Sequence, residues 1–507
     1  MKAVYTDIMK GMDHRAITEY GIPSTVLMEH AAYALESYIR KEYDTKTRIL
    51  IVCGPGNNGG DGFALARLLV QHGYERVVLA SAVTADHMSS DEAVYATVAK
   101  AYGILIVDAV DASIMEKQCK QADLIVDAIF GTGLCRNVEG NYKSLIEQLN
   151  ATHKPILSVD IPSGIHGDTG EVMGCAIHAD VTITFESYKM GHLLYPGSGY
   201  QNKLLVASID MPTRIVEEAK GITVLDKAYV KEHLPVRVAH SNKGTFGKAL
   251  LIGGSQQMHG AVTLTAKSCL RSGVGTLTLF VPSCIVPTLS MKLEESMILS
   301  APQQNGYFHM DAVEELKKHL PQFDYVIIGN GMGRNAVTKA LVQTVLQSDK
   351  PCILDGDALF ELGSCVHELA RKAPTIITPH IKEMSYVSNR SVQDIVNNPI
   401  AVIQSFLHQY PSLTIVLKDQ YTWLASNDEV FVNLAGNSSL AKGGSGDVLC
   451  GIIAGLYGQC KSSIDACCCG VYVHAHTADE LIKENDGNSI LANDIIQELH
   501  HTYKNLR

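Results

Sequence analysis

Short apolar runs alternate with amphipathic segments along most of the chain, and this alternation predicts strands followed by helices. In the first half the β-branched runs are RILIV, RVVLASAV, ILIVDA, DLIVDAIF, PILSVDIP, VTITF and LLVASID, which lie between Arg48 and Ile209. Most of them are apolar at nearly every position, which is typical of strands covered on both faces of a sheet. The segments GFALARLLVQHGY and NYKSLIEQLNA between them have helical spacing. The first half therefore predicts a doubly wound, largely parallel α/β sheet.

The alternation lapses once, between Met211 and His240, where the chain is polar and has no long apolar run. A second alternation follows, with the runs KALLIGGS, GTLTLFVP, DYVIIGNGMG, PCILDGDAL, TIITPH and LTIVLKDQ. The runs TWLAS and VFVNL, joined through Asn427–Glu429, predict a β-hairpin. We therefore expect two α/β domains, residues 1–215 and 225–507. In the first of them VLMEHAAYALESYIRKEY predicts a helix that packs on the sheet.

Composition narrows the function classes that this fold could serve. The 507 residues carry a formal net charge of -11, which argues against nonspecific nucleic-acid binding, because that binding depends on lysine and arginine. No apolar run is as long as a transmembrane helix, and the N-terminus lacks the apolar core of a signal peptide. We therefore expect no membrane segment and a cytoplasmic protein. The thirteen cysteines include no C-x-x-C pair, and Cys467–Cys469 are consecutive in an apolar segment, which predicts buried side chains rather than metal ligands.

A glycine loop follows the first apolar run. Cys53–Gly62 reads CGPGNNGGDG, which contains the G-x-G-x-x-G spacing of dehydrogenase dinucleotide sites. Such a site also needs an acidic residue at the end of the second strand, and Ala82–Thr84 there carries none. Asn57, Asn58 and Asp61 add amide and carboxylate groups that suit a polar ligand or a hard cation. A dehydrogenase is therefore disfavoured, and a plain Asn/Gly-rich turn that caps a helix is the alternative.

Two further loops place polar side chains at the ends of strands. Asp127 stands near the end of the run DLIVDAIF, which continues into a second glycine turn at Gly131–Gly133. Asp160 and Ser163 lie at the end of another strand, in the segment SVDIPSG. Because open α/β sheets bind ligands at the carboxyl ends of their strands, we expect the three loops to form one pocket.

In this order, NNGGDG, DAIFGTG and DIPSG resemble the NAD(P)H-hydrate epimerases of the YjeF N-terminal type, over roughly residues 1 to 212. The resemblance implies a Rossmann-like fold and interconversion of the R and S epimers of hydrated NADH or NADPH at C6 of the nicotinamide ring. It implies Asp160 as the polar catalytic residue, and epimerisation of this carbon needs a proton-transfer group. It also implies a potassium ion held by three residues that offer oxygen, Asn58, Asp127 and Ser163. The implied contacts with the hydrated dinucleotide are Asn57, Asn58, Gly59, Gly60, Asp61, Gly131, Thr132, Gly133, Leu134, Cys135, Arg136, Asn137 and Asp160.

The stretch AKGGSGDVLCGIIAGL (Ala441–Leu456) is the most informative part of the second half. Gly443, Gly444 and Gly446 lead into an apolar helix whose N-terminus would offer N–H groups to a phosphate. Asp447 at that helix start has the chemistry to take the proton from a hydroxyl that attacks phosphorus. The chain contains no Walker A motif, so a P-loop protein is disfavoured. A plain turn with Asp447 as a helix cap is the alternative.

Seven segments of the second half resemble the ADP- or ATP-dependent NAD(P)H-hydrate dehydratases, which have a ribokinase-like α/β fold. In order they are KGTFGKALLIGGS, HGAVTLTAKSCLRSGVG, GNGMG, DGDAL, ITPHIKE, NLAGN and GGSGDVLCGIIAGL. The resemblance implies that a nucleotide phosphorylates the ring hydroxyl and that loss of phosphate regenerates NAD(P)H, with Mg²⁺ present and Asp447 as the base. The implied contacts with the hydrate are Ala261, Gly331, His380 and Asp447. The implied contacts with the nucleotide are Lys418, Asp419, Gln420, Tyr421, Thr422 and Gly446.

Two residues depart from the dehydratase pattern. Asp419 stands where glycine commonly follows the lysine, and Asn330 stands where proline is common in the GNGMG segment. Neither departure removes an implied catalytic group. The resemblance favours ADP over ATP and implies a homo-oligomer built on tetramers of the second domain. It thus implies a bifunctional metabolite-repair enzyme; the alternatives are a ribokinase-like kinase of a small metabolite with a fused regulatory domain, and a non-catalytic nucleotide-binding protein.

Overall fold

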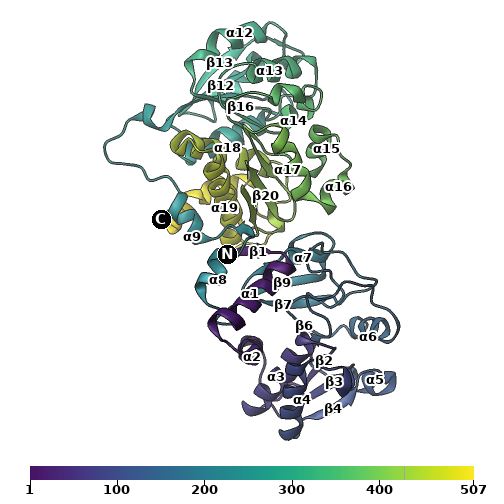
Figure 1. Ribbon diagram of the computed structural model, residues 1–507. Coiled ribbons are helices and arrows are strands. Elements are labelled where there is room, and N and C mark those ends of the chain that lie inside the picture. Colours follow the sequence, from purple (N-terminus) through teal and green to yellow (C-terminus); the bar gives the residue numbers. More distant parts are fainter. Residues whose placement is uncertain (428) are drawn as a thin grey trace. The chain divides into compact units, whose positions relative to one another are not determined.

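The chain forms two compact α/β units in a computed structural model that describes residues 1–427 and 429–507. The N-terminal unit is Lys2–Ile222, and the C-terminal unit is Thr223–Arg507 together with Met1. Figure 1 shows both units with the element labels that are used below. Among the described residues no helix has the length and apolar character that crossing a membrane requires.

The sheet of the N-terminal unit has seven parallel strands in the order β4-β3-β2-β5-β6-β7-β9. Their bounds are β2 (Ile49–Cys53), β3 (Val77–Ser81), β4 (Leu105–Asp108), β5 (Leu124–Ala128), β6 (Ile156–Val159), β7 (Ala179–Phe185) and β9 (Gln201–Ala207). A shorter parallel pair joins β1 (Lys2–Val4) to β8 (Tyr188–Lys189). The doubly wound parallel sheet predicted from the apolar runs is confirmed. Its strand order reverses between β2 and β5, where sheets of this kind bind ligands.

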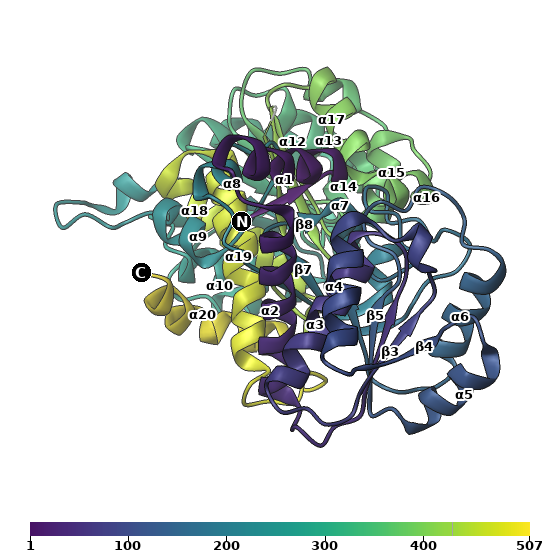
Figure 2. The same ribbon diagram turned by 60° about the horizontal axis from the view of Figure 1, so that its bottom comes forward.

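Helices cover both faces of this sheet, and Figure 2 shows α2, α3 and α4 on one face and α5 and α6 on the other. Their bounds are α1 (Thr6–Tyr20), α2 (Ser24–Glu42), α3 (Asn57–Gln71), α4 (Ser90–Ala101), α5 (Ala112–Gln121), α6 (Gly140–Asn150), α7 (Met190–Leu193) and α8 (Thr213–Glu218), with 3-10 turns η1 (Ala85–His87) and η2 (Gly197–Tyr200). In β2, Ile49 and Ile51 belong to the core that contains α2 and α3, whereas Leu50 and Val52 belong to the core that contains α5 and α6. This two-sided burial explains why the run is apolar at every strand position.

The main sheet of the C-terminal unit has the strand order β13-β12-β11-β16-β17-β18-β19-β20-β21-β10. Its bounds are β10 (Ile222–Val224), β11 (Lys248–Ile252), β12 (Thr276–Pro282), β13 (Met297–Ala301), β16 (Tyr325–Ile328), β17 (Cys352–Leu354), β18 (Thr375–Ile377), β19 (Leu413–Leu417), β20 (Thr422–Ser426) and β21 (Glu429–Asn433). Neighbours from β13 to β19 are parallel. Strands β20 and β21 form the antiparallel hairpin predicted from TWLAS and VFVNL, while Asp428, in its predicted connection, lies outside the described residues. A small antiparallel pair is β14 (Gln303–Gln304) with β15 (Tyr307–Phe308).

Helices also cover the strands of the C-terminal unit, and in Figure 1 α18 and α19 lie on one side of them and α14, α15 and α17 on the other. The helices are α9 (Lys227–His233), α10 (His259–Arg271), α11 (Val286–Ser290), α12 (Ala312–His319), α13 (Ala336–Leu346), α14 (Asp357–Leu362), α15 (Ile381–Ser388), α16 (Val392–Asn397), α17 (Pro399–Gln409), α18 (Ser445–Cys460), α19 (Ser463–Leu481) and α20 (Ala492–Leu506). The 3-10 turns are η3 (Lys243–Phe246), η4 (Ser283–Ile285), η5 (Leu320–Gln322), η6 (Val366–Leu369) and η7 (Ser438–Leu440). Cys467–Cys469 are free thiols buried in the core between α19 and its neighbours, which confirms the prediction made for them.

The polar segment between Met211 and His240 contains regular structure that the apolar pattern did not predict. It holds α8, β10 and α9, each of them short. Single side chains such as Ile215 and Val230 anchor these elements in the two cores. A short element buries too few residues to produce a long apolar run.

Helix α3 packs closely on the loop before it because Gly59 has no side chain. A Cβ atom at Gly59 would lie 2.0 Å from the carbonyl oxygen of Gly54 and 2.8 Å from Oε1 of Glu92. Glu92 in turn accepts a hydrogen bond of 2.9 Å from the backbone N–H of Gly56. The glycine loop after β2 is thus fixed between α3 and α4.

We expect Gly59→Ala to lower the free energy of unfolding by about 1–3 kcal/mol, because the added methyl group forces backbone to move. The matched control is Gly11→Ala in α1, where an added Cβ has nothing within 4 Å. This control should be neutral or slightly stabilising, since alanine favours helix. Denaturant unfolding measures both variants, and equal stability of the two would contradict the close packing of α3 on the loop.

Candidate active sites

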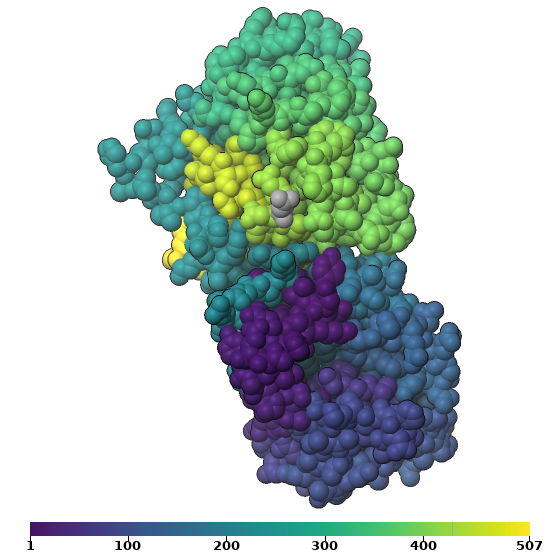
Figure 3. Space-filling view, viewed as in Figure 1, coloured from purple at the N-terminus to yellow at the C-terminus, as the bar shows by residue number. Residues whose placement is uncertain are grey.

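The N-terminal unit contains a cavity of about 510 Å³ beside the reversal of strand order. Its walls are the loops that follow β2, β5 and β6, together with residues of α1 and α2. Helix α1 also forms part of the surface of this unit, in purple in Figure 3. The three polar loops singled out in the sequence therefore meet at one cavity, as predicted for the carboxyl edge of the sheet.

Most of the residues implied to contact a hydrated dinucleotide line this cavity. They are Asn57, Asn58, Asp61, Gly131, Thr132, Gly133, Leu134, Cys135, Arg136 and Asp160. Gly59, Gly60 and Asn137 do not line it. Gly60 instead packs against Met28, where an added Cβ would lie 2.6 Å from the methyl carbon. These two glycines serve the packing of α3 rather than the surface of the cavity.

Asp160 has an uncommon backbone conformation, and both its carbonyl oxygen and its carboxylate accept hydrogen bonds. Its φ angle is 64°, in the left-handed region, and its carbonyl accepts a hydrogen bond of 2.9 Å from Nε2 of His192. Its Oδ1 accepts from Nζ of Lys189 at 2.6 Å and from Oγ1 of Thr184 at 2.8 Å. Burial acts to raise the pKa of Asp160, but the ammonium group of Lys189 outweighs it and holds that pKa below its ordinary value. The carboxylate of Asp160 is thus ionised at the cavity wall.

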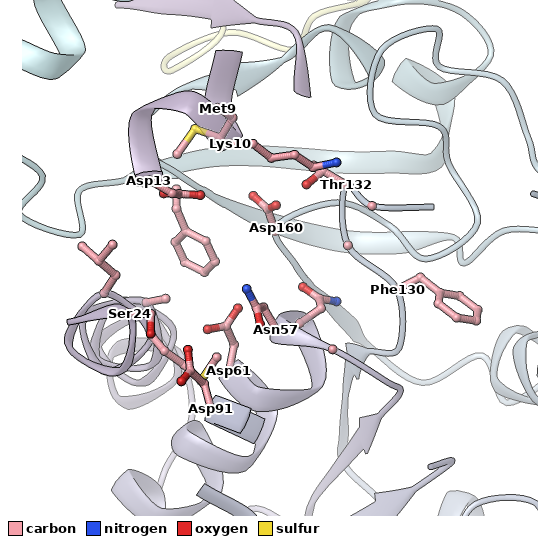
Figure 4. A pocket seen from close by; sticks show the side chains of 18 of the residues that line it. Met9, Lys10, Asp13, Ser24, Asn57, Asp61, Asp91, Phe130, Thr132 and Asp160 are labelled. Atoms are coloured by element: carbon pink, nitrogen blue, oxygen red, sulfur yellow. The ribbon is translucent and has the colours of Figure 1, made fainter. Parts of the chain in front are cut away.

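The carboxyl groups of Asp13 and Asp61 face the same cavity, and their pKa values are raised rather than lowered. Burial raises the pKa of Asp13 to about 6, and the neighbouring Asp160 adds to the shift against the opposing effect of Lys189. Burial raises the pKa of Asp61 well above its ordinary value, and Asp160 and Asp13 raise it further. Figure 4 shows Asp13, Asp61 and Asp160 reaching the cavity from α1, α3 and the end of β6.

The three residues implied to hold potassium adjoin the same loops. Asp127 is fully buried, and its two oxygens accept hydrogen bonds from Ser158 Oγ, Ser163 Oγ and the backbone N–H groups of Ser163 and Ile129. Ser163 Oγ also accepts from the N–H of Phe130 at 2.8 Å. Asn58 packs against Gly131, and its Nδ2 is buried with no hydrogen-bond partner among the described residues. Asn58 lines the cavity, whereas Asp127 and Ser163 are buried and do not line it.

The C-terminal unit gathers its predicted residues at the carboxyl edge of β16, β17, β18 and β19. Asn330, after β16, donates its Nδ2 to Asp447 Oδ1 at 2.8 Å and to Asp355 Oδ2 at 3.1 Å. Asp355, after β17, also accepts from Lys418 Nζ at 3.1 Å and from Thr378 Oγ1 at 2.7 Å. Asp447 lies in the first turn of α18, directly after the glycines of GGSGD. The sequence placed Asp447 and Lys418 at one site, and this network links them through Asp355 and Asn330.

The pKa of the Asp447 carboxyl group lies closer to neutrality than is usual for an aspartate. Burial raises its pKa to about 6, the carboxylate of Asp355 adds to this, and the hydrogen bond from Asn330 works against it. Burial acts to lower the pKa of Lys418, but Asp355 and Glu383 outweigh it and raise that pKa. Lys418 therefore remains charged, and it offsets the charge of Asp355 more directly than that of Asp447.

The other residues implied for the second site are placed around this network. A Cβ at Gly446 would lie 3.4 Å from Lys418 Nζ, and one at Gly331 would lie 3.0 Å from Cβ of Ala261. His380 precedes α15 and caps it, accepting from the N–H groups of Lys382 and Glu383 through Nδ1. It also forms a parallel bridge with Lys418. Residues 418–422 span the turn between β19 and β20, where Asp419 and Gln420 are exposed.

Four residues of these sites were not among the site residues predicted from the sequence. They are Asp13, Lys189, Asn330 and Asp355. Asp355 stands in the segment DGDAL at a strand end, and that position was the signal available for it. Lys189 and Asp13 are single charged residues far from the glycine loops in the sequence, and only the fold brings them to the cavity.

Two family models match the chain. One, described as YjeF-related protein N-terminus, matches residues 24–191, and the other, described as NAD(P)H-hydrate dehydratase, matches residues 249–501. Among solved structures, a ribokinase-like superfamily protein from Enterococcus faecalis is similar, with 28% identity and a TM-score of 0.50 over 56% of this chain and 96% of that one. The fold expected for each half is thereby confirmed.

Three relatives that span almost the whole chain are named bifunctional NAD(P)H-hydrate repair enzymes. The protein of Thermofilum pendens is 34% identical, with 100% of this chain and 97% of the relative covered. That of Moorella thermoacetica is also 34% identical, over 98% and 96%. That of Escherichia coli is 31% identical, over 98% and 92%. The two family models match in order along the chain, and the relatives align over almost its whole length. The chain therefore belongs to the family of bifunctional NAD(P)H-hydrate repair enzymes, which join an epimerase to a dehydratase.

Proposed function

We propose that the cavity of the N-terminal unit interconverts the R and S epimers of hydrated NADH and NADPH, and that the Asp447 site dehydrates the S epimer at the expense of ADP. One observation carries the proposal. Each unit presents a partly buried carboxyl group at the carboxyl edge of its sheet, and the two pKa values are shifted in opposite directions, that of Asp160 lowered and that of Asp447 raised to about 6. Two such groups suit two different proton transfers.

In the dehydratase reaction, Asp447 acts as general base on the ring hydroxyl. As it takes that proton, the hydroxyl oxygen bonds to the β-phosphorus of ADP and the bond to AMP breaks. The C6–O bond of the phosphorylated ring then breaks with its electron pair, and a proton leaves C5, so that phosphate and NAD(P)H are the products. Helix α18 begins at Ser445, within GGSGD, and the N-terminus of a helix suits the phosphates of a nucleotide.

The Asn330–Asp447 hydrogen bond has a defined part in this step. It fixes one oxygen of Asp447 and favours its ionised form. The other oxygen of Asp447 accepts no hydrogen bond from the described residues, so it can take the hydroxyl proton. Asn330, the departure from the proline of the family pattern, thus orients the base.

Mg²⁺ and potassium have different places in the proposed function. Among the described residues no group of three or more His, Cys, Asp or Glu could hold a metal ion, so Mg²⁺ is proposed to accompany the nucleotide phosphates and no step is assigned to it. Asn58, Asp127 and Ser163 fit a potassium ion better, because Asp127 is fully buried and has no cationic partner among the described residues. The ion would supply positive charge behind the loops that carry Gly131 and Asp160. A homo-oligomer built on C-terminal units and a cytoplasmic location remain proposals that rest on the resemblance.

Recovery of NADH from the R and S epimers distinguishes the two activities. We expect Asp447→Asn to slow ADP-dependent recovery of NADH from the S epimer by about a hundredfold or more, because it removes the base. Asp160→Asn should leave recovery from the S epimer unchanged and slow recovery from the R epimer to its spontaneous rate. The absorbance of the NADH band follows both, and each variant is the control for the other. R-epimer turnover that is unchanged in Asp160→Asn would refute the assignment of Asp160.

The dehydration rate should fall as the pH drops through about 6, because only ionised Asp447 can accept a proton and its pKa is raised to that value. Asn330→Ala removes a hydrogen bond that favours the ionised form, so the acidic limb of the pH–rate profile should move up by about one pH unit. Asn335→Ala is the matched control, since Asn335 caps α13 in the same loop and does not bond to Asp447. An acidic limb that does not move in Asn330→Ala would exclude the proposed role of Asn330.

Potassium dependence should be confined to the first reaction. When choline replaces K⁺ in the assay, we expect slower turnover of the R epimer and unchanged dehydration of the S epimer. In Asp127→Asn the residual R-epimer turnover should no longer respond to K⁺. A wild-type rate that is independent of K⁺ would argue against the site.

A further inference from the structure

The epimerase cavity contains a carboxyl group, Asp13, that no sequence motif singled out. It lies on α1, where Met9, Asp13 and Ile17 are four residues apart and all line the cavity. Residues at this spacing share one face of a helix. Figure 4 shows the carboxyl group of Asp13 turned toward the side of the cavity where Asp160 stands. Helix α1 therefore supplies a proton-carrying group on a different wall from the glycine loops.

The hydrogen bonds of Lys189 decide how charge is divided in this cavity. Its Nζ donates to Asp160 Oδ1 at 2.6 Å, to Thr184 Oγ1 at 2.8 Å and to the carbonyl oxygen of Phe185 at 3.1 Å. A lysine ammonium group has three N–H donors, so these bonds use all of them. Lys189 therefore serves Asp160 and has no donor left for Asp13 or Asp61.

Asp13 and Asp61 are left without such partners. Neither carboxyl group accepts a hydrogen bond from any residue that the structure describes. Asp61 is only 9% exposed and faces the cavity, which marks the cavity as a place where a ligand supplies the missing partner. Like-charged carboxyl groups that share one site do not all ionise. Asp13 and Asp61 are thus the groups that hold protons.

The remaining charged groups around Asp13 are few. Lys10 on α1, Asp91 on α4 and Arg136 on the turn after β5 line the same cavity. Glu186, after β7, adds to the rise in the pKa of Asp13, whereas Lys189 opposes it. Burial, opposed by Lys189 and reinforced by Asp160 and Glu186, raises the pKa of Asp13 to about 6. That value lets Asp13 gain and lose a proton near neutral pH, whereas burial raises the pKa of Asp61 well above its ordinary value and so favours its protonated form.

Resting on the proposed epimerase function, we propose that Asp13 is the catalytic acid that works with Asp160 as the base, and that Lys189 is a positioning residue that holds Asp160. Asp61, as a neutral carboxyl group, serves as a hydrogen-bond donor to the substrate. Environments that push the proton affinities of two groups apart are the usual basis for such a division of roles.

The step conserves atoms and electrons. Asp160 takes the proton of the C6 hydroxyl, the O–H pair becomes the second bond of a C6 aldehyde, and the C6–N1 bond breaks with its electron pair moving to N1. Asp13 gives its proton to N1, so that a neutral open-chain aldehyde forms. Rotation about the C5–C6 bond presents the other face of the aldehyde to N1. The reverse transfers then close the ring with inverted C6 and restore both carboxyl groups.

Asp13→Asn tests the acid. We expect kcat for conversion of the R epimer to fall by about a hundredfold or more, with KM changed by less than about threefold, because an amide cannot give up a proton. The wild-type rate should fall as pH rises above about 6, where Asp13 loses its proton, and Asp13→Asn should lack this basic limb. Asp13→Glu should restore at least about a tenth of the wild-type rate together with the basic limb.

Asp7→Asn is the matched control, because Asp7 lies on the same helix but is exposed and does not line the cavity. It should retain wild-type kinetics. Lys189→Met should move the acidic limb to higher pH, since Asp160 loses the charge that keeps it ionised. Wild-type protein that does not convert the R epimer would overturn the proposed function itself. Wild-type conversion that Asp13→Asn retains within about twofold, with its basic limb intact, would overturn the role of Asp13 alone.

Discussion

An ionised carboxylate leaves water only when hydrogen bonds or a cation replace its hydration, and both sites of this protein depend on that constraint. Asp160 meets it with a buried lysine at 2.6 Å and remains charged. For Asp447 the hydrogen bond from Asn330 replaces only part of the lost hydration, because the lysine of its site bonds to Asp355 instead. The proton affinity of each carboxyl group thus follows from where the nearest ammonium group lies.

The folds explain why such groups gather where they do. In both units, parallel strands end at one edge, and the residues that follow them cannot continue the backbone ladder. Asp160 follows β6, and Asp355 follows β17, so each stands beside loops from neighbouring strands. Helix α3 packs closely on the glycine loop at Gly59, and Glu92 accepts a hydrogen bond from the loop. These contacts fix the loop that forms one wall of the first cavity. Rigid walls matter here, because a misplaced donor would leave a buried carboxylate unpaired.

Much of the fold could be predicted from the sequence, because its strands are covered on both faces and therefore apolar at successive positions. The run ILIVDA shows the limit of this signal: it forms β4 at an edge of the sheet, where Leu105 is 55% exposed. The residue pattern of a strand does not reveal which neighbours it has. Motifs placed Asp160 at the end of a strand and Asp447 at the start of a helix, whereas Lys189 and Asp13 reach the cavity through tertiary packing alone. Asn330 was noted as a departure from a pattern, and its bond to Asp447 required the structure.

The proposed function requires two separate proton-transfer sites on one chain, with the product of the first feeding the second. Mixing the two variants that each lack one base, Asp160→Asn and Asp447→Asn, tests this requirement most directly. With ADP and an equal mixture of both epimers of hydrated NADH, the mixed variants should recover all of the NADH, at a rate that exceeds spontaneous epimerisation. Recovery that stops at the S epimer's share, or that does not occur at all, would contradict the account.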